Sequence, residues 1–356
     1  MSDFLKNKVV LQDMDEIFNA RASWRAINDR SVYITGAAGM IASYITMFLI
    51  YLNEIRGFNI SIFAGVRKPN KARQRFGNYI DKEYFHLVIG NAIDPIDRNV
   101  HASYIIHAAS LASPQYYGEM PVEVMLPNVV GTYRLLEHAR KTAAEGLLFL
   151  SSGEVYGAIG GVGVIDEKTI GCMDFLSSGN VYGVSKQCGE ALCKAYSREY
   201  AVSAKSARIH HSYGPTMDVG SDERVFSDFI RRILCDSDIV LKSDGTAKRA
   251  FCYMTDVVSG LFAILIDGAS GESYNLGNPN EYLEIKELAE RLVSLFPEKH
   301  LKVLCAKRST DNCTSRPEQR ASPFSTDKLE RLHWAASVTV EEGFARCVRA
   351  LSGDGF

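Results

Sequence analysis

The sequence predicts an α/β protein, with a doubly wound parallel sheet followed by a smaller C-terminal lobe that binds the substrate. From residue 31 onwards, short and nearly continuous hydrophobic runs alternate with segments of helical length. This pattern is typical of parallel strands that are covered on both faces. A glycine-rich turn follows the first hydrophobic run and opens a helix. After about residue 208 the alternation weakens into short mixed elements.

The same patterns place the elements along the chain. Apolar positions recur with helical spacing over residues 10–29, so we expect residues 1–30 to form a helical extension that packs on the body or caps a dimer. We expect a sheet domain over residues 31–208 and a substrate lobe over residues 209–356, some segments of which return to the sheet domain. The expected strands are 31–35, 59–65, 85–89, 103–109 and 146–151, with helices at 40–53 and 121–141.

Composition and charge point to a cytoplasmic, soluble protein. The 40 basic and 42 acidic residues give a net charge of −2, which favours neither nucleic acid nor a membrane surface as a partner. The longest apolar run, residues 47–52, is too short to span a bilayer, and the charged N-terminus does not resemble a signal peptide. The eight cysteines form no CxxC pair and no metal-like spacing with histidine, so we expect a reducing compartment and no metal.

The turn TGAAGMIA, residues 35–42, is the first motif with a chemical meaning. Gly36 and Gly39 permit a tight turn and a close approach of the backbone to a pyrophosphate. The pyrophosphate would lie at the N-terminus of the following helix, beside Met40 and Ile41. Because the turn stands between a strand and a helix, as this motif requires, we expect a Rossmann domain that binds NAD or NADP rather than a plain turn.

The end of the second expected strand bears on the choice of cofactor. An acidic residue there would bind the adenosine ribose 2′-hydroxyl, whereas an arginine accommodates a 2′-phosphate. Arg67 stands at this place, in the stretch AGVRKPNKAR, and favours NADP over NAD. A solvated basic loop explains the same residues about as well. Asn91 falls where this fold commonly brings a polar side chain to the adenine.

The segment NVYGVSKQCGE, residues 180–190, carries the expected acid–base group. Tyr182 and Lys186 are four residues apart, so both project from one face of a helix. A lysine ammonium near a phenol favours the phenolate and lowers a pKa that is otherwise about 10. Such a tyrosine exchanges a proton with a carbinol during hydride transfer. Ser152 would supply a hydroxyl to the reacting oxygen; the alternative is a surface Tyr–Lys pair.

These motifs together resemble the extended short-chain dehydrogenase/reductase superfamily and, within it, the NAD-dependent epimerase/dehydratase family that acts on nucleotide sugars. The resemblance covers about residues 31–350 and rests on TGAAGMIA, HAAS, LPNVVGT, SSGEVYG, YGVSK and GPTM. Longer strings, including AASLASPQYY and DGTAKRAFCYMTDVVSGL, look most like decarboxylases of UDP-glucuronate.

The resemblance implies particular ligands and a particular assembly. The nicotinamide cofactor would contact Ala108 and Ala109 in addition to Tyr182 and Lys186. The substrate would be a nucleotide sugar, with Ser113 among its contacts. The protein would be a homodimer, because this fold often dimerises through a bundle that includes the Tyr–Lys helix.

By the same resemblance, the turn after Ser152 distinguishes between reactions. In 4,6-dehydratases an Asp–Glu pair there removes water from the sugar, and Gly153 stands in the place of that aspartate. Decarboxylases keep the glutamate beside a small hydroxyl residue, whereas simple 4-epimerases generally lack it. Glu154 is therefore expected to face the C5 side of the sugar. A carboxylate that caps a loop is the alternative.

Basic residues of the C-terminal half are the expected ligands of the nucleotide diphosphate. The planar fork of arginine suits bidentate contact with phosphate, and by resemblance Arg224 and Arg249 would hold it; a solvated face is the alternative. His211 stands where the family usually has an asparagine, and as a phosphate donor it would make binding sensitive to pH. Decarboxylases also carry an arginine near the C-terminal segment. Arg316 and Arg320 lie in this segment, but neither aligns cleanly with the position of that arginine. We expect Arg320 to bind substrate.

The leading hypothesis is a nucleotide-sugar enzyme that oxidises C4 transiently with a bound nicotinamide cofactor and decarboxylates a UDP-uronic acid. The alternatives among enzymes are a 4,6-dehydratase, an epimerase and a 4-keto reductase. Arg67 slightly favours the reductase, because a consumed hydride donor is usually the phosphorylated one. A non-catalytic nucleotide sensor or scaffold is the alternative from another class, against which the intact set of Tyr182, Lys186 and Ser152 argues.

Overall fold

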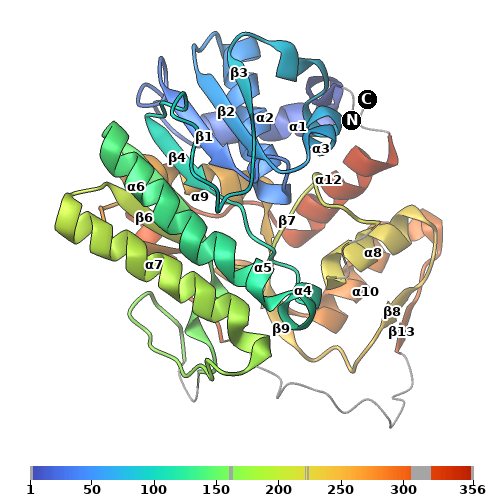
Figure 1. Cartoon of the computed structure of the whole chain (residues 1–356). Coiled ribbons are helices and arrows are strands. Elements are labelled where there is room, and N and C mark those ends of the chain that lie inside the picture. Colours follow the sequence, from blue (N-terminus) through green and yellow to red (C-terminus); the bar gives the residue numbers. More distant parts are fainter. Residues whose placement is uncertain (1–2, 160–162, 221, 223, 306–321, 354–356) are drawn as a thin grey trace.

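A seven-stranded parallel sheet lies at the centre of the computed structural model, which describes residues 3–159, 163–220, 222, 224–305 and 322–353 (Figure 1). The strand order is β11-β6-β5-β4-β1-β2-β3, and every neighbouring pair is parallel. The predicted doubly wound α/β class is thereby confirmed. The strands are β1 (Ser31–Thr35), β2 (Ser61–Val66), β3 (Phe85–Ile89), β4 (Tyr104–His107), β5 (Gly146–Ser152), β6 (Ala204–Ile209) and β11 (Ser273–Leu276).

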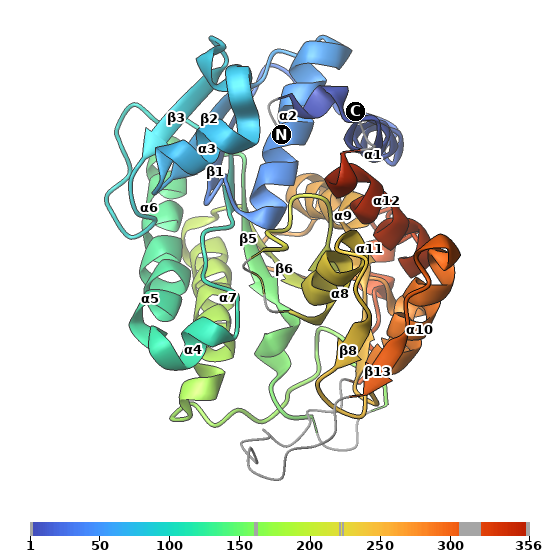
Figure 2. The same ribbon diagram turned by 90° about the vertical axis from the view of Figure 1, so that its right-hand side faces the viewer.

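Helices cover both faces of this sheet, as Figure 2 shows from a second direction. One face packs against α2 (Met40–Arg56) and α9 (Met254–Asp267), and α1 (Lys8–Asn19) lies against both of these helices. The other face packs against α6 (Thr132–Thr142) and α7 (Val181–Tyr200), with α5 (Pro121–Leu126) beside α7. Burial on both faces explains why the strands read as continuous apolar runs rather than as alternating ones. Within the described residues no helix has the length and apolar character needed to cross a membrane.

The expected single helix over 121–141 is interrupted. The chain forms α5, then a π-helical turn at Pro127–Gly131, and then α6. Proline lacks an N–H group and disturbs a regular helix, and π-turns are frequent at functional sites. This turn lies beneath α7 and packs against it.

The second lobe has its own hydrophobic core on one side of the sheet. Three short strand pairs extend it: β7 (Ser212–Tyr213) with β10 (Cys252–Tyr253), β9 (Lys248–Ala250) with β12 (Tyr282–Glu284), and β8 (Ile239–Leu241) with β13 (Val303–Cys305). The remaining helices are α3 (Pro69–Phe76), α4 (Gln115–Glu119), α8 (Val225–Leu234), α10 (Ile285–Leu295), α11 (Asp327–Glu330) and α12 (Val340–Ser352). Of these, α8, α10 and α12 enclose the second core.

The N-terminal helix α1 is shorter than the predicted residues 10–29, and it joins the two lobes. Its fully buried Asp13 accepts hydrogen bonds from the phenols of Tyr44 on α2 and Tyr253 on β10. The guanidinium of Arg346 on α12 donates to the same carboxylate at 2.8 Å. A buried carboxylate is tolerated only where such partners surround it. The extension therefore serves packing, one of the two roles that we expected for it.

Candidate active site

The glycine turn lies between β1 and α2 and touches the loop after β4. Gly36 has a φ of +67°, a conformation that favours glycine. A Cβ atom added there would lie 2.9 Å from the Cα of Ala109. The turn closes with a 2.7 Å hydrogen bond from the Gly39 N–H to the Gly36 carbonyl. No described side chain caps α2 at Gly39, so its first N–H groups are open to an anion.

Thr35 and His107 lock this turn to the neighbouring loop. The hydroxyl of Thr35 lies 2.7 Å from His107 Nδ1 and accepts the N–H groups of Ala108 and Ala109, each at 3.2 Å. Burial lowers the pKa of His107 to about 3, so the imidazole is neutral. Its Nε2 then donates to the Pro127 carbonyl at 2.9 Å, and Thr35 donates to Nδ1. The three predicted cofactor residues Gly36, Ala108 and Ala109 thus form one rigid surface.

The other predicted cofactor residues lie at the same edge of the sheet. Arg67 is exposed directly after β2, and Asn91 is half-buried after β3, with its N–H bonded to the Asp94 carboxylate at 2.8 Å. Met40 and Ile41 form the first turn of α2. Because carboxyl ends of parallel strands share one edge, these positions border the glycine turn.

Tyr182 and Lys186 are buried on the first two turns of α7. The Lys186 ammonium donates to the Leu150 carbonyl at 2.6 Å and lies 5.5 Å from the centre of the Tyr182 ring. Burial lowers the pKa of Lys186 to about 7, although the charge of Glu190 opposes this shift. The pair is therefore a buried one rather than a surface one.

The pKa of the Tyr182 phenol differs from our expectation. Burial raises it to about 12, and the charge of Glu154 raises it further, whereas a hydrogen bond with Ser152 and the charge of Arg224 lower it. The expected lowering by Lys186 is absent from these causes, because the lysine is turned towards the Leu150 carbonyl. Without its ligands, Tyr182 is held as the neutral phenol.

Ser152 and Glu154 lie on the turn that follows β5. The chain forms a single 3₁₀ turn over Gly153–Tyr156, and the Ser152 hydroxyl accepts the N–H of Glu154 at 3.2 Å. The Glu154 carboxylate is exposed, yet its charge acts on Tyr182. The structure therefore brings Ser152, Glu154, Tyr182 and Lys186 together at the carboxyl end of one strand.

A buried ion pair supports this strand end from below. The Arg208 guanidinium binds Glu190 with its Nη2 2.7 Å from Oε2, and Ser151 donates to Oε1 of the same carboxylate at 2.6 Å. Arg208 also donates to the Tyr156 phenol at 2.9 Å, and that phenol donates to the Asn275 side chain at 2.7 Å. These bonds tie β5, β6, β11 and α7 together beneath the catalytic turn.

Three of the predicted substrate residues lie close enough for the charges of two of them to act on the third. Burial and the positive charges of Arg249 and Arg224 lower the pKa of His211 to about 3. In the free protein His211 is thus neutral through the physiological range, which differs from the pH-sensitive donor that we expected. The Arg224 guanidinium binds Asp222, with Nε 2.9 Å from each carboxylate oxygen, and Arg249 donates to the Lys248 carbonyl at 2.7 Å.

The last two predicted substrate residues have different outcomes. Ser113 is half-buried just before α4, and its carbonyl accepts the N–H of Tyr116 at 3.1 Å. Arg320, like Arg316, lies outside the described residues.

Sequence reasoning missed two residues that contact the catalytic helix. The Tyr117 ring is stacked on the Tyr182 ring, with centroids 5.1 Å apart and planes inclined by 9°. Asn128, on the π-turn, donates to the Ser185 hydroxyl at 2.9 Å, and its Oδ1 is buried without a partner among the described residues. The strings AASLASPQYY and LPNVVGT contained both residues, but neither string says what they touch.

The residues present fit a dinucleotide. The Gly36 turn packs so closely on the backbone of Ala109 that a side chain at residue 36 would not fit, and the start of α2 offers N–H groups to phosphate. The hydroxyl of Ser110, in the loop beside them, is buried with no hydrogen-bond partner among the described residues. Such an orphaned group commonly pairs with a ligand or an ordered water. Among the described residues, no group of three His, Cys, Asp or Glu side chains lies close enough together to bind a metal ion.

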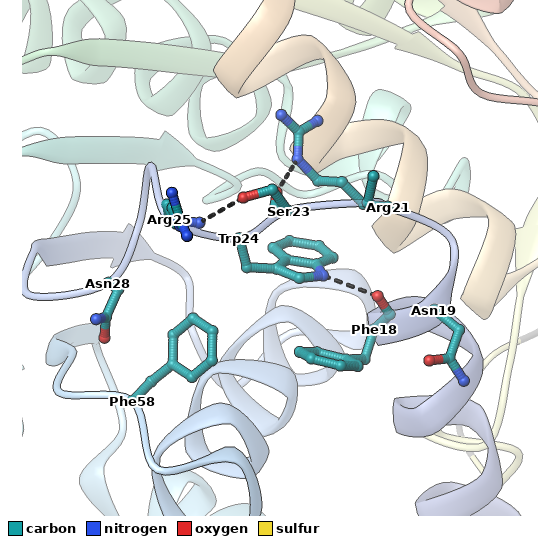
Figure 3. A pocket seen from close by; sticks show the side chains of 9 residues that line it. Phe18, Asn19, Arg21, Ser23, Trp24, Arg25, Asn28 and Phe58 are labelled. Atoms are coloured by element: carbon teal, nitrogen blue, oxygen red, sulfur yellow. Dashed lines mark hydrogen bonds between the residues drawn. The ribbon is translucent and has the colours of Figure 1, made fainter.

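A pocket of about 410 Å³ lies elsewhere, on the N-terminal segment (Figure 3). Phe18, Trp24 and Phe58 line it, together with the polar residues Asn19, Arg21, Ser23, Arg25 and Asn28. The Trp24 indole donates to the Phe18 carbonyl at 2.8 Å, and Arg21 donates to the Ser23 carbonyl at 2.7 Å. None of the residues that line this pocket belongs to the catalytic group, so we do not assign it to the active site.

Comparison with known sequences agrees with this geometry. Residues 32–277 match the NAD dependent epimerase/dehydratase family. UDP-glucuronic acid decarboxylase 6 of Arabidopsis thaliana is 31% identical over 315 residues, which cover 88% of this chain and 86% of the relative. UDP-glucuronic acid decarboxylase 1 of Danio rerio is 30% identical over 324 residues, which cover 91% of this chain and 73% of the relative.

Solved structures share the fold at lower identity. UDP-glucose 4-epimerase of Thermotoga maritima, solved with UDP-glucose, superimposes with a TM-score of 0.77 at 21% identity and covers 91% of this chain and 99% of its own. dTDP-glucose 4,6-dehydratase of Bacillus anthracis, in complex with NAD, gives a TM-score of 0.72 at 21% identity and covers 91% and 97%. The family match spans most of the sheet, the glycine turn and the Tyr182–Lys186 segment. The chain belongs to the NAD dependent epimerase/dehydratase family.

Proposed function

We propose that this protein decarboxylates a UDP-uronic acid through transient oxidation of the sugar at C4. The observation that carries the proposal is the meeting of Ser152, Tyr182 and Lys186 at the end of β5 with Glu154 beside them. The relatives named as UDP-glucuronic acid decarboxylases support the choice of substrate.

In this reaction Tyr182, deprotonated once the cofactor and the substrate are bound, would take the proton of the sugar 4-hydroxyl and return it when that hydroxyl re-forms, and Ser152 would hydrogen-bond the same oxygen. A nicotinamide dinucleotide held by these residues would supply a reversible hydride acceptor for C4, so that the net reaction would involve no redox change. The 4-keto sugar is a β-keto acid. Its C5–C6 bond breaks, the electron pair passes into the enolate, carbon dioxide leaves, and C5 takes up a proton.

The chain's own residues contribute binding and orientation to each stage. Arg224 and Arg249 would neutralise the diphosphate of the nucleotide, the neutral His211 would donate a hydrogen bond to it, and Ser113 would contact the sugar end. The cofactor would be held by Gly36, Gly39, Met40, Ile41, Arg67, Asn91, Ala108, Ala109, Tyr182 and Lys186.

The test is incubation of the purified protein with UDP-glucuronate and added NAD or NADP, with products followed by mass spectrometry and carbon dioxide release. We expect a UDP-pentose and carbon dioxide, both abolished by Tyr182→Phe and not by the matched change Tyr133→Phe on the exposed face of α6. Loss of water from a neutral nucleotide sugar, or interconversion of its C4 epimers, would instead identify a dehydratase or an epimerase.

For the cofactor we propose a preference for NADP, because Arg67 stands exposed where a 2′-phosphate would lie. Proteins of this fold have been solved with NAD and with NADPH, so the fold is compatible with either. Arg67→Ala should weaken NADP binding roughly tenfold and leave NAD binding unchanged, since a charge-assisted contact is lost. Equal dissociation constants of wild type and variant for NADP would refute the preference.

We further propose a homodimer that pairs the helices α5, α6 and α7. Val122, Tyr133 and Tyr200 are 62%, 44% and 46% exposed on these three helices, which suits an interface. Sedimentation of wild type and Tyr133→Glu tests it: only the variant should be monomeric.

The seven described cysteines are all free, as is usual in the reducing cytoplasm, which is the location that we propose.

A further inference from the structure

A histidine ring fills the place where a side chain at residue 153 would lie. His210 follows β6, and its N–H donates to the Leu276 carbonyl of β11 at 2.9 Å. A Cβ atom added at Gly153 would lie 2.6 Å from Cε1, 2.7 Å from Nδ1 and 3.3 Å from Nε2 of His210. The polar edge of the imidazole, with both nitrogens, therefore points at Gly153, and a side chain at 153 and the ring exclude each other.

A second glycine and an aromatic ring hold this imidazole in place. Phe324 is stacked on it with centroids 3.7 Å apart and planes inclined by 6°. A Cβ atom at Gly277 would lie 2.6 Å from the Phe324 ring and 3.0 Å from the His210 Cβ. Gly153 and Gly277 thus make the space that the stacked pair occupies.

The imidazole has hydrogen-bonding capacity that the protein leaves unused. Its Nε2 is buried with no partner among the described residues. Burial and the charge of Arg208 lower the pKa of His210 to about 4, although a hydrogen bond with Asn275 raises it. A neutral imidazole offers one donor and one acceptor, and a buried unpaired nitrogen is costly unless a ligand or water completes it.

The turn at which this ring points carries the reacting groups. Gly153 stands between Ser152, which hydrogen-bonds Tyr182, and Glu154, whose charge acts on Tyr182. When Ser152 and Tyr182 bind the hydroxyl group of one sugar carbon, the neighbouring carbon and its substituent come next to this turn.

We propose that His210 is a specificity-determining residue, whose imidazole takes the place of a side chain at Gly153 and hydrogen-bonds an oxygen of the C5 substituent of the sugar. This inference rests on the proposed function, because it needs the 4-hydroxyl between Ser152 and Tyr182. An uncharged imidazole also suits a carboxylate that must leave as carbon dioxide. It does not stabilise the carboxylate of the bound substrate with a full opposite charge, which would slow its loss.

The experiment compares two nucleotide sugars that differ in the C5 substituent, UDP-glucuronate and UDP-xylose, the second of which has none. Their dissociation constants are measured by calorimetry with saturating cofactor on the full chain carrying Tyr182→Phe, which prevents turnover. Adding His210→Phe keeps a ring on Phe324 and removes both nitrogens. We expect UDP-glucuronate to bind roughly 3- to 10-fold more weakly, the value of one hydrogen bond, and UDP-xylose to bind as before.

Equal weakening for both sugars, or none for either, would overturn the role of His210 and leave the proposed function standing. Failure of the Tyr182→Phe parent to bind UDP-glucuronate, together with no carbon dioxide release by wild type, would overturn the proposed function instead. Gly153→Ala provides a second route, because its methyl group must displace the ring, and it should give the same selective loss. Its control is Gly163→Ala, whose added methyl group meets no atom of the described residues within 4 Å and which should change neither constant.

Discussion

The ring of Tyr117 lies flat against the ring of Tyr182, with centroids 5.1 Å apart and planes inclined by 9°. The Tyr117 phenol is itself anchored, since it donates to the Ala112 carbonyl at 3.0 Å. Tyr117 on α4, anchored to the segment before it, therefore constrains the orientation of the Tyr182 phenol on α7. Orientation of a proton-transfer group is a large part of what such a site provides.

Loss of this stack should slow the reaction with little effect on substrate binding. Tyr117→Leu removes the aromatic contact, and we expect kcat for carbon dioxide release to fall roughly 2- to 10-fold, the value of one aromatic pair. Tyr117→Phe keeps the ring and should retain nearly full kcat. Steady-state kinetics with UDP-glucuronate check both variants, and equal kcat values for the two would refute the orienting role.

Lys186 should lower the free energy of unfolding, and most strongly below about pH 7. The reason is that the folded protein binds the Lys186 proton more weakly than the unfolded chain does. The folded pKa is about 7 and the ordinary value is 10.5. Between these values the unfolded state binds more protons, so the contribution of Lys186 to the free energy of unfolding rises with pH. The change is at most about 1.4 kcal/mol per pH unit.

Lys186→Met should therefore stabilise the ligand-free protein at pH 6. It should also abolish turnover, because the proposed reaction uses Lys186. Denaturant unfolding of wild type and variant from pH 6 to pH 10 measures this, and the advantage of the variant should shrink as the pH rises. A difference that stays constant over the whole range would contradict the assigned pKa. Lys194→Met, in the exposed half of α7, is the control and should give parallel curves.

Asp13 should have the opposite dependence on pH. Burial raises its pKa from 3.8 to about 6, against the hydrogen bonds of Tyr44, Tyr253 and Arg346. Between these values the folded state binds more protons than the unfolded chain, so the contribution of Asp13 to stability falls as pH rises from about 4 to about 6.

Asp13→Asn should remove that slope, because an amide does not ionise. Thermal or denaturant unfolding between pH 4 and pH 7 compares it with wild type and with Asp15→Asn. Asp15 lies on the same helix with 46% of its side chain exposed, and its replacement should leave the slope as it is. An unaltered slope in Asp13→Asn would mean that the carboxylate is not the group that titrates.

The fold and the centre of the site could be predicted because their signals are local. Hydrophobic runs located the strands within a few residues, and the i, i+4 spacing located Tyr182 and Lys186. Other features depend on contacts between distant segments, which no spacing encodes. The stacking of Tyr117, the ring of His210 against Gly153 and the high pKa of Tyr182 are of this kind. The third follows from burial, which outweighs the hydrogen bond of Ser152 and the charge of Arg224, both of which lower the pKa.

The glycine turn offers a test that separates backbone strain from contact with the loop after β4. Gly36 and Gly57 have nearly equal φ values of +67° and +70°. A Cβ atom at Gly36 would lie 2.9 Å from the Cα of Ala109, whereas one at Gly57 meets no atom within 4 Å. Replacement by alanine strains the backbone at both sites, at a cost of about 1 kcal/mol, but displaces the neighbouring loop only at Gly36.

We therefore expect Gly57→Ala to lower the unfolding free energy by about 1 kcal/mol and to bind the cofactor like wild type. Gly36→Ala should be less stable than Gly57→Ala and should bind NAD or NADP at least roughly tenfold more weakly, because the methyl group would push the loop of Ala109 away from the turn at which we expect the pyrophosphate to bind. Denaturant unfolding and cofactor titration by fluorescence measure the two quantities separately. If Gly36→Ala lost stability alone, and bound cofactor as Gly57→Ala does, the turn would not be the phosphate site.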